Sequence, residues 1–289
     1  MIKTTKYDVE LWLKTVATGE FHYKEVLDGQ IDPMSFGNLR KIMSELSRGD
    51  SALIEPVGRR DGFYRVIQDG VLPVDWQSVK AKVDFPIVLP FDLRKYVFIY
   101  PNTAIVVAGS KSSGKTGFLY RTVALNMNKI NTILLSNMEG GREQLRDRFC
   151  AMDIEIPTPA PFIVLPVSDN FHDYIRKPNT LYVIDYIDAP DGTDFYLIGA
   201  KISKIRKKLP PNSVAVIGIQ KPTFRDVGFG GEGTLKDSTL YLAMDSSKLK
   251  IVDAKVPANP RIHPKNMQFT FQYSNEGTNF LNIQRDYGD

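Results

Sequence analysis

Three runs near the start of the chain place apolar side chains at helical spacing. They cover residues 8–18, 23–28 and 33–47, and a glycine follows each run within two residues. The first run begins with Asp8, a residue type that favours helix N-termini. The pattern predicts three small helices. The third has the clearest apolar stripe, formed by Phe36, Leu39, Ile42, Met43 and Leu46.

Two strand-like runs follow these helices. Residues 52–56 and 63–67 are joined by a turn that contains two glycines, which predicts a β-hairpin. Three small helices followed by a hairpin resemble a winged-helix domain, in which the third helix enters the major groove of DNA and the hairpin contacts the backbone. Many winged helices bind only protein, so a protein-binding or structural face is the alternative. The resemblance implies groove contacts from Asn38, Arg40, Lys41 and Arg48, and backbone contacts from Arg59 and Arg60.

Residues 69–103 connect this segment to the rest of the chain. Residues 74–83 are compatible with one short helix, but prolines interrupt any longer element. We therefore expect an N-terminal domain over residues 1–70, a linker over 71–84 and a second domain over 85–289. The interrupting prolines are Pro73, Pro86, Pro90 and Pro101.

Beyond the linker, short apolar runs alternate with helical runs, the order typical of an α/β domain with a parallel sheet. The strand-like runs cover residues 104–108, 131–136, 181–185, 214–219, 249–255, 268–273 and 278–283, and the helical runs cover 117–128 and 198–209. The second helical run is basic, but its apolar residues at helical spacing predict that its lysines form a solvated face. A nucleic-acid role for that face is the alternative.

The segment from Gly109 to Thr116 has the pattern GxxxxGK[ST] between a predicted strand and a predicted helix. Such a loop cradles phosphate oxygens with backbone N–H groups, and the positive end of the helix dipole adds to the attraction. Lys115 would reach the β- and γ-phosphates, and the Thr116 hydroxyl would hold Mg²⁺. The sequence therefore predicts binding of a nucleoside triphosphate with Mg²⁺. The predicted binding residues are Gly109, Ser110, Lys111, Ser112, Ser113, Gly114, Lys115, Thr116 and Gly117.

Two acidic residues follow predicted strands. Glu139 comes three residues after the run 131–136, where it could deprotonate or orient an attacking water. Its alternative role is that of a loop or helix-start glutamate. Asp185 ends the run 181–185 and is the candidate magnesium ligand.

Residues 85–285 resemble the RecA-like ATPases, and within them the DnaB-type replicative helicases. Three segments carry the resemblance: Ile184 to Ile187, Met138-Glu139 with the later Gln144-Leu145-x-x-Arg148, and the strand 214–219 ending at Gln220. The order of Met138 and Glu139 is reversed relative to that family. The resemblance implies a mostly parallel sheet flanked by helices, with Glu139 as the catalytic glutamate and Asp185 as the magnesium aspartate.

The resemblance also implies roles outside the nucleotide site. Gln220 would report the γ-phosphate to a DNA-contacting loop at residues 223–234, which contains Arg225; a flexible surface hairpin is the alternative for that loop. Lys255 and Arg261 would reach the γ-phosphate of a neighbouring subunit, although Pro257 occupies the position where the family has an arginine. That arrangement implies a homo-oligomeric ring or filament, such as a hexamer.

Composition adds limits. The 289 residues are 43% hydrophobic and 24% charged, and the net charge of +4 is too small to establish a nucleic-acid partner by itself. The single cysteine excludes an internal disulfide, and with three histidines it gives no zinc site. We find no signal peptide and no apolar run long enough for a membrane span, so we expect a cytoplasmic protein.

These patterns lead to two hypotheses. The first is an ATP-hydrolysing, DNA-dependent motor related to helicases, from a replication or mobile-element system. The second is an ATP-switched regulator or assembly factor that oligomerises on duplex DNA without unwinding it. The N-terminal segment favours the second, because replicative helicases do not generally carry a winged helix there. A protein-remodelling ATPase is a third, less favoured interpretation.

Overall fold

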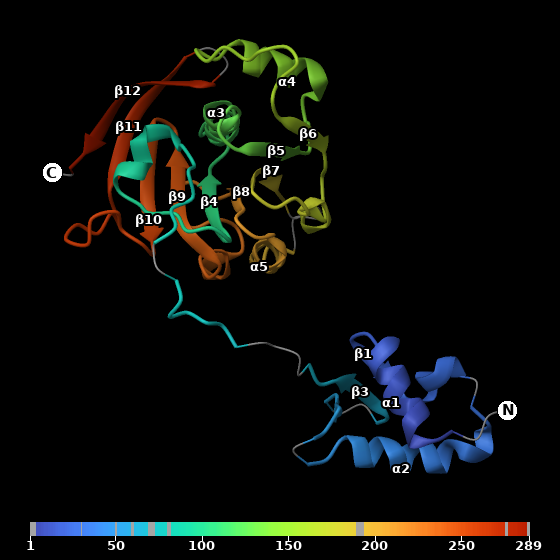
Figure 1. Ribbon diagram of the computed structural model, residues 1–289. Coiled ribbons are helices and arrows are strands. Elements are labelled where there is room, and N and C mark those ends of the chain that lie inside the picture. The colour runs from blue at the N-terminus through green and yellow to red at the C-terminus, as the bar shows by residue number, and fades with distance from the viewer. Residues whose placement is uncertain are drawn as a thin grey trace. The chain divides into compact units, whose positions relative to one another are not determined.

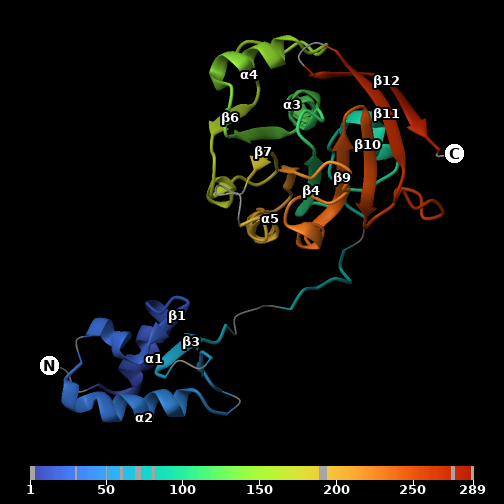
Figure 2. The ribbon, with the colours of Figure 1, turned by 180° about the vertical axis from the view of Figure 1, so that it is seen from behind.

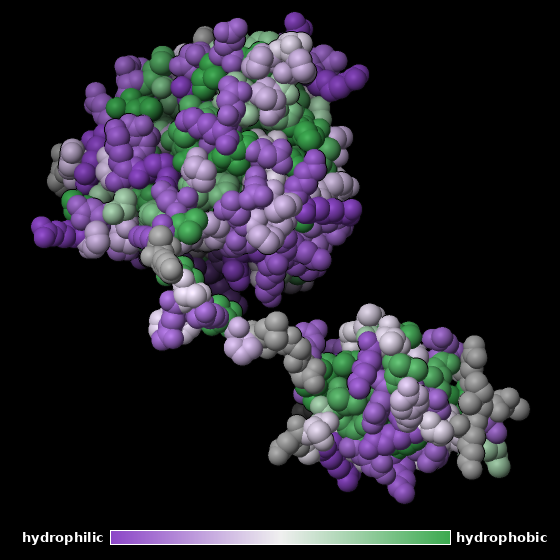
Figure 3. Space-filling model, viewed as in Figure 1, coloured by the Kyte–Doolittle hydropathy of each residue, from purple (hydrophilic) through white to green (hydrophobic). Residues whose placement is uncertain are grey.

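The computed structural model of the chain describes residues 4–29, 31–49, 51–58, 61–68, 73–79, 82–188, 194–274 and 277–287. The chain divides into two compact units, Met1–Lys80 and Ala81–Asp289 (Figure 1). Polar side chains cover much of the visible face of each unit (Figure 3). Among the described residues, no helix has the length and apolar character needed to cross a bilayer.

The first unit combines two α-helices with a small sheet. Its elements are α1 (Lys6–Thr15), β1 (Glu20–His22), the 3₁₀ helices η1 (Tyr23–Gly29) and η2 (Pro33–Ser35), α2 (Phe36–Leu46), β2 (Ile54–Pro56) and β3 (Phe63–Val66). The three strands pair antiparallel in the order β1-β3-β2. The predicted stripe of α2 supplies Leu39, Ile42 and Met43 to a core that α1 completes with Val9 and Leu13. Burial of this stripe is what fixes α2 against the sheet.

Helix α1 begins earlier than the predicted start at Asp8. Thr5 is the N-cap: its hydroxyl accepts from the Asp8 N–H at 3.3 Å, and the Asp8 carboxylate accepts from the Thr5 N–H at 3.0 Å. This reciprocal capping box satisfies two N–H groups that the helix cannot pair internally. Asp8 is therefore a first-turn residue rather than the cap.

The second predicted helix, at residues 23–28, is wrong as an α-helix. The segment forms η1, in which Leu27 and Asp28 have positive φ values of 55°. Positive φ is incompatible with a continuing right-handed helix, so the segment turns instead. Strand β1, which precedes it and pairs with β3, was not predicted.

The predicted helix at residues 74–83 is absent from the described residues 73–79 and 82–89. A single turn remains, in which the Ser78 N–H and hydroxyl donate to Asp75. A helix this short is marginal in water unless its apolar side packs on something. The apolar side chains here are exposed: Val74, Trp76, Val79 and Val83.

The second unit is built on one large sheet. Its strands are β4 (Thr103–Gly109), β5 (Asn131–Ser136), β6 (Ile163–Pro166), β7 (Thr180–Ile187), β8 (Val214–Gln220), β9 (Ser238–Asp245), β10 (Lys248–Ala254), β11 (Gln268–Ser274) and β12 (Asn279–Asp286). Across the described residues the order is β12-β11-β10-β9-β4-β8-β7-β5-β6. The strands from β9 to β6 are parallel, and β10 to β12 extend the sheet antiparallel. The predicted α/β class with a mostly parallel sheet is confirmed, although β6 and β9 were not predicted.

Helices cover both faces of this sheet. They are α3 (Lys115–Asn126), α4 (Gly141–Cys150), α5 (Leu197–Lys208) and the 3₁₀ helices η3 (Pro90–Lys95), η4 (Phe171–Tyr174) and η5 (Gly231–Thr234). Figures 1 and 2 show α3 and α5 on opposite sides of the strands. Because side chains alternate along a strand, Ile105 and Val107 of β4 join the core under α3, whereas Val106 joins the core under α5. Burial on both faces explains why β4 reads as an unbroken apolar run.

The strand order determines where the loops meet. Strand β4 lies between β8 and β9, and β7 separates β8 from β5. Because these strands are parallel, the loops that follow β4, β5, β7 and β8 leave the same edge of the sheet. That edge carries the candidate site.

Candidate nucleotide-binding site

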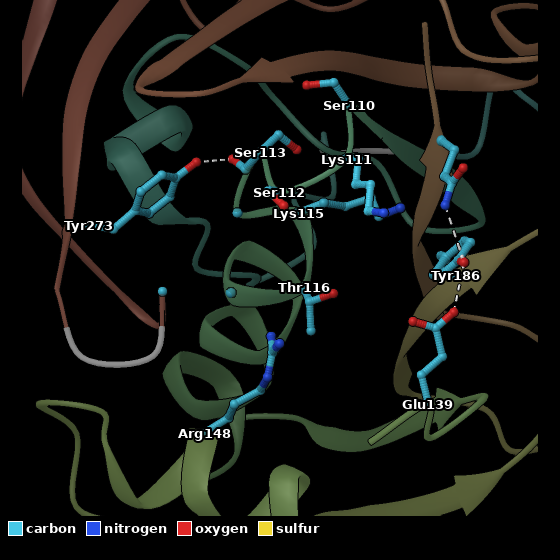
Figure 4. A pocket seen from close by; sticks show the side chains of 14 residues that line it. Ser110, Lys111, Ser112, Ser113, Lys115, Thr116, Glu139, Arg148, Tyr186 and Tyr273 are labelled. Carbon is cyan, nitrogen blue, oxygen red and sulfur yellow. Dashed lines mark hydrogen bonds between the residues drawn. The ribbon is translucent and has the colours of Figure 1, made fainter. Parts of the chain in front are cut away.

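The loop between β4 and α3 forms the floor of a cavity of about 870 Å³ (Figure 4). Eight consecutive residues of the predicted phosphate loop line it, from Ser110 to Gly117. Gly109 ends β4 and is buried at the base of the loop. The other lining residues are Glu139, Arg148, Tyr186, Gln220, Tyr273 and Gly277.

The loop is held against the antiparallel end of the sheet. Gly114, at φ +85°, is the N-cap of α3, and a Cβ there would collide with the Tyr273 ring. The Tyr273 hydroxyl donates to the Ser113 carbonyl. The αL conformation and the close ring both require glycine at this position. The loop therefore keeps its shape through β11 as well as through its own sequence.

Gly117 is the second position where the backbone comes close. A Cβ on Gly117 would collide with the carbonyl oxygen of Gly277, between β11 and β12. We expect Gly117→Ala to destabilise the second unit by about 1–3 kcal/mol, because backbone must move to admit the methyl group. Urea titration followed by far-UV circular dichroism measures this. Fluorescence of Trp12 and Trp76, which lie outside the second unit, should be unaffected.

Gly233→Ala is the matched control, since a Cβ there meets nothing within 4 Å. Its free energy of unfolding should stay within about 0.5 kcal/mol of the wild-type value. Equal stability of Gly117→Ala and Gly233→Ala would contradict the close contact between α3 and the β11–β12 hairpin.

Lys115, Thr116 and Asp185 lie together at the start of α3. The Thr116 hydroxyl donates to Asp185 Oδ1 at 3.2 Å. Lys115 and Asp185 are 8% and 4% exposed. Burial lowers the pKa of Lys115 to about 8, although the carboxylates of Asp185, Glu139 and Asp188 raise it. Burial also raises the pKa of Asp185, whereas the charge of Lys115 and the hydrogen bond from Thr116 lower it. A cation bound beside Asp185 would favour the ionised carboxylate further.

Glu139, Tyr186 and Gln220 form a second group, on the far side of Lys115. The Tyr186 hydroxyl donates to Glu139 Oε1 at 2.8 Å, and Gln220 Nε2 donates to the Tyr186 hydroxyl at 3.2 Å. The Lys115 ammonium nitrogen lies 3.8 Å from the centroid of the Tyr186 ring. In Figure 4 the side chains of Glu139 and Tyr186 lie next to each other, on the opposite side of the cavity from Ser113 and Tyr273.

Two side-chain donors at the cavity have no hydrogen-bond partner among the described residues. They are Ser113 Oγ and Arg148 Nε, and both atoms are buried. Arg148 extends from α4 towards Thr116 (Figure 4). Buried donors without partners are rare, and here they suit the oxygens of a phosphate group.

The oxygens of Thr116 and Asp185 fit Mg²⁺, which takes one or two protein ligands together with substrate phosphates and water. No group of three or more His, Cys, Asp or Glu in the described part of the chain could hold a metal ion alone. A magnesium ion at this site would therefore depend on phosphate ligands as well.

The structure thus brings the predicted residues Lys115, Thr116, Glu139 and Gln220 to one cavity, with Asp185 buried behind it in contact with Thr116. Sequence reasoning did not assign Arg148, Tyr186, Tyr273 or Gly277 to the site. Two of these had a signal: Tyr186 directly follows Asp185, and Arg148 ends the Gln-Leu-x-x-Arg segment. Nothing in the local sequence marks Tyr273 or Gly277.

Several predicted residues lie away from the cavity. Lys255 is exposed and its ammonium donates to the Lys236 carbonyl at 2.9 Å, and Arg261 is exposed. Arg225 is exposed in the loop after β8. The basic helix α5 buries its apolar side, and two of its basic residues are paired with carboxylates: Lys201 with Asp169, and Arg206 with Asp237.

The predicted DNA contacts of the first unit are on or near α2. Asn38, Arg40, Lys41 and Arg48 are all exposed. Asn38 donates to the Thr4 carbonyl at 3.2 Å, and Arg40 donates to the Tyr23 hydroxyl at 3.0 Å. Lys41 and Arg48 complete the exposed set. The predicted hairpin contacts, Arg59 and Arg60, lie outside the described residues.

No protein-family model matches this sequence, and no curated protein matches it. Among solved structures, the chain is similar to a DnaB-like replicative helicase studied with its interactions with primase, at 12% identity and a TM-score of 0.46. That alignment covers 64% of this chain and 58% of the other, so this chain spans less than two thirds of it. The chain is also similar to a second solved protein, described as an ATPase domain, at 14% identity and a TM-score of 0.45, over 64% of this chain and 86% of that one.

Proposed function

We propose that this protein is a P-loop ATPase with a RecA-like core, and that DNA stimulates its ATP hydrolysis. One observation carries the proposal: the phosphate loop and the exposed carboxylate of Glu139 line the same cavity, and Thr116 of that loop is hydrogen-bonded to the buried carboxylate of Asp185, a pair suited to magnesium. These groups come from β4, β5 and β7, which end at one edge of the sheet. A GxxxxGK[ST] motif that arose by chance would not be accompanied by the carboxylates of Asp185 and Glu139.

In the proposed reaction a water molecule attacks the γ-phosphorus of ATP. The bond from that phosphorus to the bridging oxygen breaks, ADP leaves, and the proton of the water passes to the Glu139 carboxylate. Lys115 and the loop N–H groups bind the phosphate oxygens, and Arg148, which lines the same cavity, adds a second cation. Mg²⁺ held by Thr116 and Asp185 would neutralise charge on the β- and γ-phosphate oxygens.

The loop after Gln220 supports coupling to nucleic acid. Phe224 is 98% exposed and Arg225 beside it is exposed, and aromatic and arginine side chains stack on unpaired bases. The loop returns to Gln220, because the Phe229 N–H donates to the Gln220 carbonyl at 2.9 Å. A change at Gln220 would therefore reach the loop through one hydrogen bond. In this proposal Lys255 and Arg261 act on the neighbouring subunit of a ring or filament.

The second candidate function is an ATP-switched regulator that assembles on duplex DNA. The polar face of α2 favours it, because its exposed residues suit groove contacts if the first unit is a winged-helix domain. The order α1-β1-η1-η2-α2-β2-β3 with a three-stranded antiparallel sheet supports that assignment.

One experiment separates the two functions. We would measure steady-state ATP hydrolysis without DNA, with single-stranded DNA and with duplex DNA, at one low salt concentration, together with sedimentation. Strong stimulation by single strands and a ring-sized species would support the motor. Preference for duplex, or nucleotide-dependent assembly without stimulation, would support the regulator. Absence of ATP hydrolysis in every condition would contradict the proposed enzyme.

The pKa of Lys115 gives a further prediction. Because burial lowers its pKa to about 8, Lys115 loses its charge as the pH rises above that value, and ATP, which binds the charged ammonium, then binds only together with a proton. We expect the affinity for ATP to fall by about tenfold per pH unit above pH 8. Equilibrium titration with a fluorescent ATP analogue between about pH 7.5 and 9.5 measures it. Lys115→Arg stays charged over this range, so a similar decline in that variant would contradict the assignment.

A further inference from the structure

The hydroxyl of Tyr186 joins two residues that follow different strands. It donates to Glu139, which follows β5, and it accepts from Gln220, which ends β8. Strand β7, which carries Tyr186, lies between β5 and β8 in the sheet. Tyr186 therefore bridges the residue proposed to take the proton and the residue proposed to sense the γ-phosphate.

An irregularity in β7 allows this bridge. The pairing of β7 with β8 is regular from Leu181 to Ile184, and the register shifts before Ile187. Successive side chains of a regular strand point to opposite faces, whereas Asp185 and Tyr186 both line a smaller cavity that also contacts Thr116 and Glu139. Gly218 on β8 provides the space, since a Cβ there would lie 3.3 Å from the Tyr186 Cβ.

The Tyr186 hydroxyl is a neutral donor at this position. Burial is the main reason why the pKa of Tyr186 is raised above its ordinary value, and the hydrogen bond to Glu139 raises it further. A phenol can donate one hydrogen bond, and the Tyr186 hydroxyl donates it to Glu139, because a carboxylate oxygen acts as the acceptor. The remaining lone pairs accept from the Gln220 amide. The direction of each hydrogen bond is thus fixed by chemistry.

We infer that Tyr186 is a positioning residue that transmits the orientation of Gln220 to the general base Glu139. The inference rests on the proposed ATP hydrolysis. Gln220 orients the hydroxyl of Tyr186, and that hydroxyl orients Oε1 of Glu139. The other carboxylate oxygen, Oε2, then faces the attacking water. A movement of Gln220 towards a γ-phosphate oxygen reaches Glu139 through a single side chain.

Tyr186→Phe tests the inference, because it keeps the ring that contacts Lys115 and removes only the hydroxyl. We expect kcat for ATP to fall by about 10- to 100-fold, with KM and the affinity for a fluorescent ATP analogue unchanged. Tyr182→Phe is the matched control: it removes a hydroxyl from the same strand, where it donates to the Lys177 carbonyl at 2.8 Å, and its kcat should equal that of the wild type.

A double-mutant cycle provides the readout that a structural role would not affect. If Gln220 acts through Tyr186, Gln220→Leu should lower kcat in the wild type and change it little in the Tyr186→Phe background. Effects that multiply, a wild-type kcat for Tyr186→Phe, or lost ATP binding in that variant would each overturn the inference. Failure of the wild type itself to hydrolyse ATP would instead overturn the proposed function on which the inference rests.

Discussion

Lys115→Ala should abolish ATP turnover, with a decrease in kcat/KM on the order of 10³-fold or more. Lys115 is nine-tenths buried at the N-terminus of α3, where its ammonium faces the cavity beside Asp185 and the Tyr186 ring. Alanine removes the charge that would neutralise the β- and γ-phosphates, and a low-dielectric position makes that charge count for more than it would in water. Steady-state hydrolysis measured by phosphate release gives the result.

The control for this variant is Lys129→Ala. Lys129 is exposed just beyond the C-terminal end of α3, so this change removes a lysine near the same helix without altering the cavity. Its turnover should equal that of the wild type. Retained hydrolysis in Lys115→Ala would show that the phosphate loop is not the catalytic nucleotide site.

The phosphate loop was predictable because its pattern is contiguous. Lys115 and Thr116 are adjacent in the sequence, and the run 104–108 before them is apolar throughout. Asp185 was predictable for a related reason, since residues at the carboxyl ends of parallel strands meet at one edge of a sheet. Gln220 was predicted only from the resemblance to the RecA-like ATPases.

The hydrophobic pattern could not predict contacts that arise from distant parts of the chain. Tyr273 reaches the loop at Ser113 from 160 residues away, and no local feature of β11 indicates it. The sequence does not indicate the register shift in β7 near Tyr186 either. In a regular strand the side chains of Asp185 and Tyr186 would point to opposite faces of the sheet. The segment 23–28 was misread for a different reason: its side chains fit a helix, but the backbone turns through positive φ at Leu27 and Asp28.

Glu139→Gln should reduce kcat by about 10²- to 10⁴-fold and leave ATP binding largely intact. Glutamine has nearly the same shape and can still accept the hydrogen bond from the Tyr186 hydroxyl, so the change removes the proton acceptor while keeping the group of contacts around it. Hydrolysis assays paired with titration of a fluorescent ATP analogue measure both properties.

The matched control is Glu143→Gln, an exposed glutamate in the first turn of α4 that does not line the cavity. It makes the same chemical change four residues away, and its kcat should match that of the wild type. Loss of ATP binding in Glu139→Gln would mean that Glu139 maintains the shape of the site. A normal kcat with normal ATP binding would instead show that the general base is a group other than Glu139. An amide cannot accept the proton, so replacing a required proton acceptor by glutamine must lower the rate.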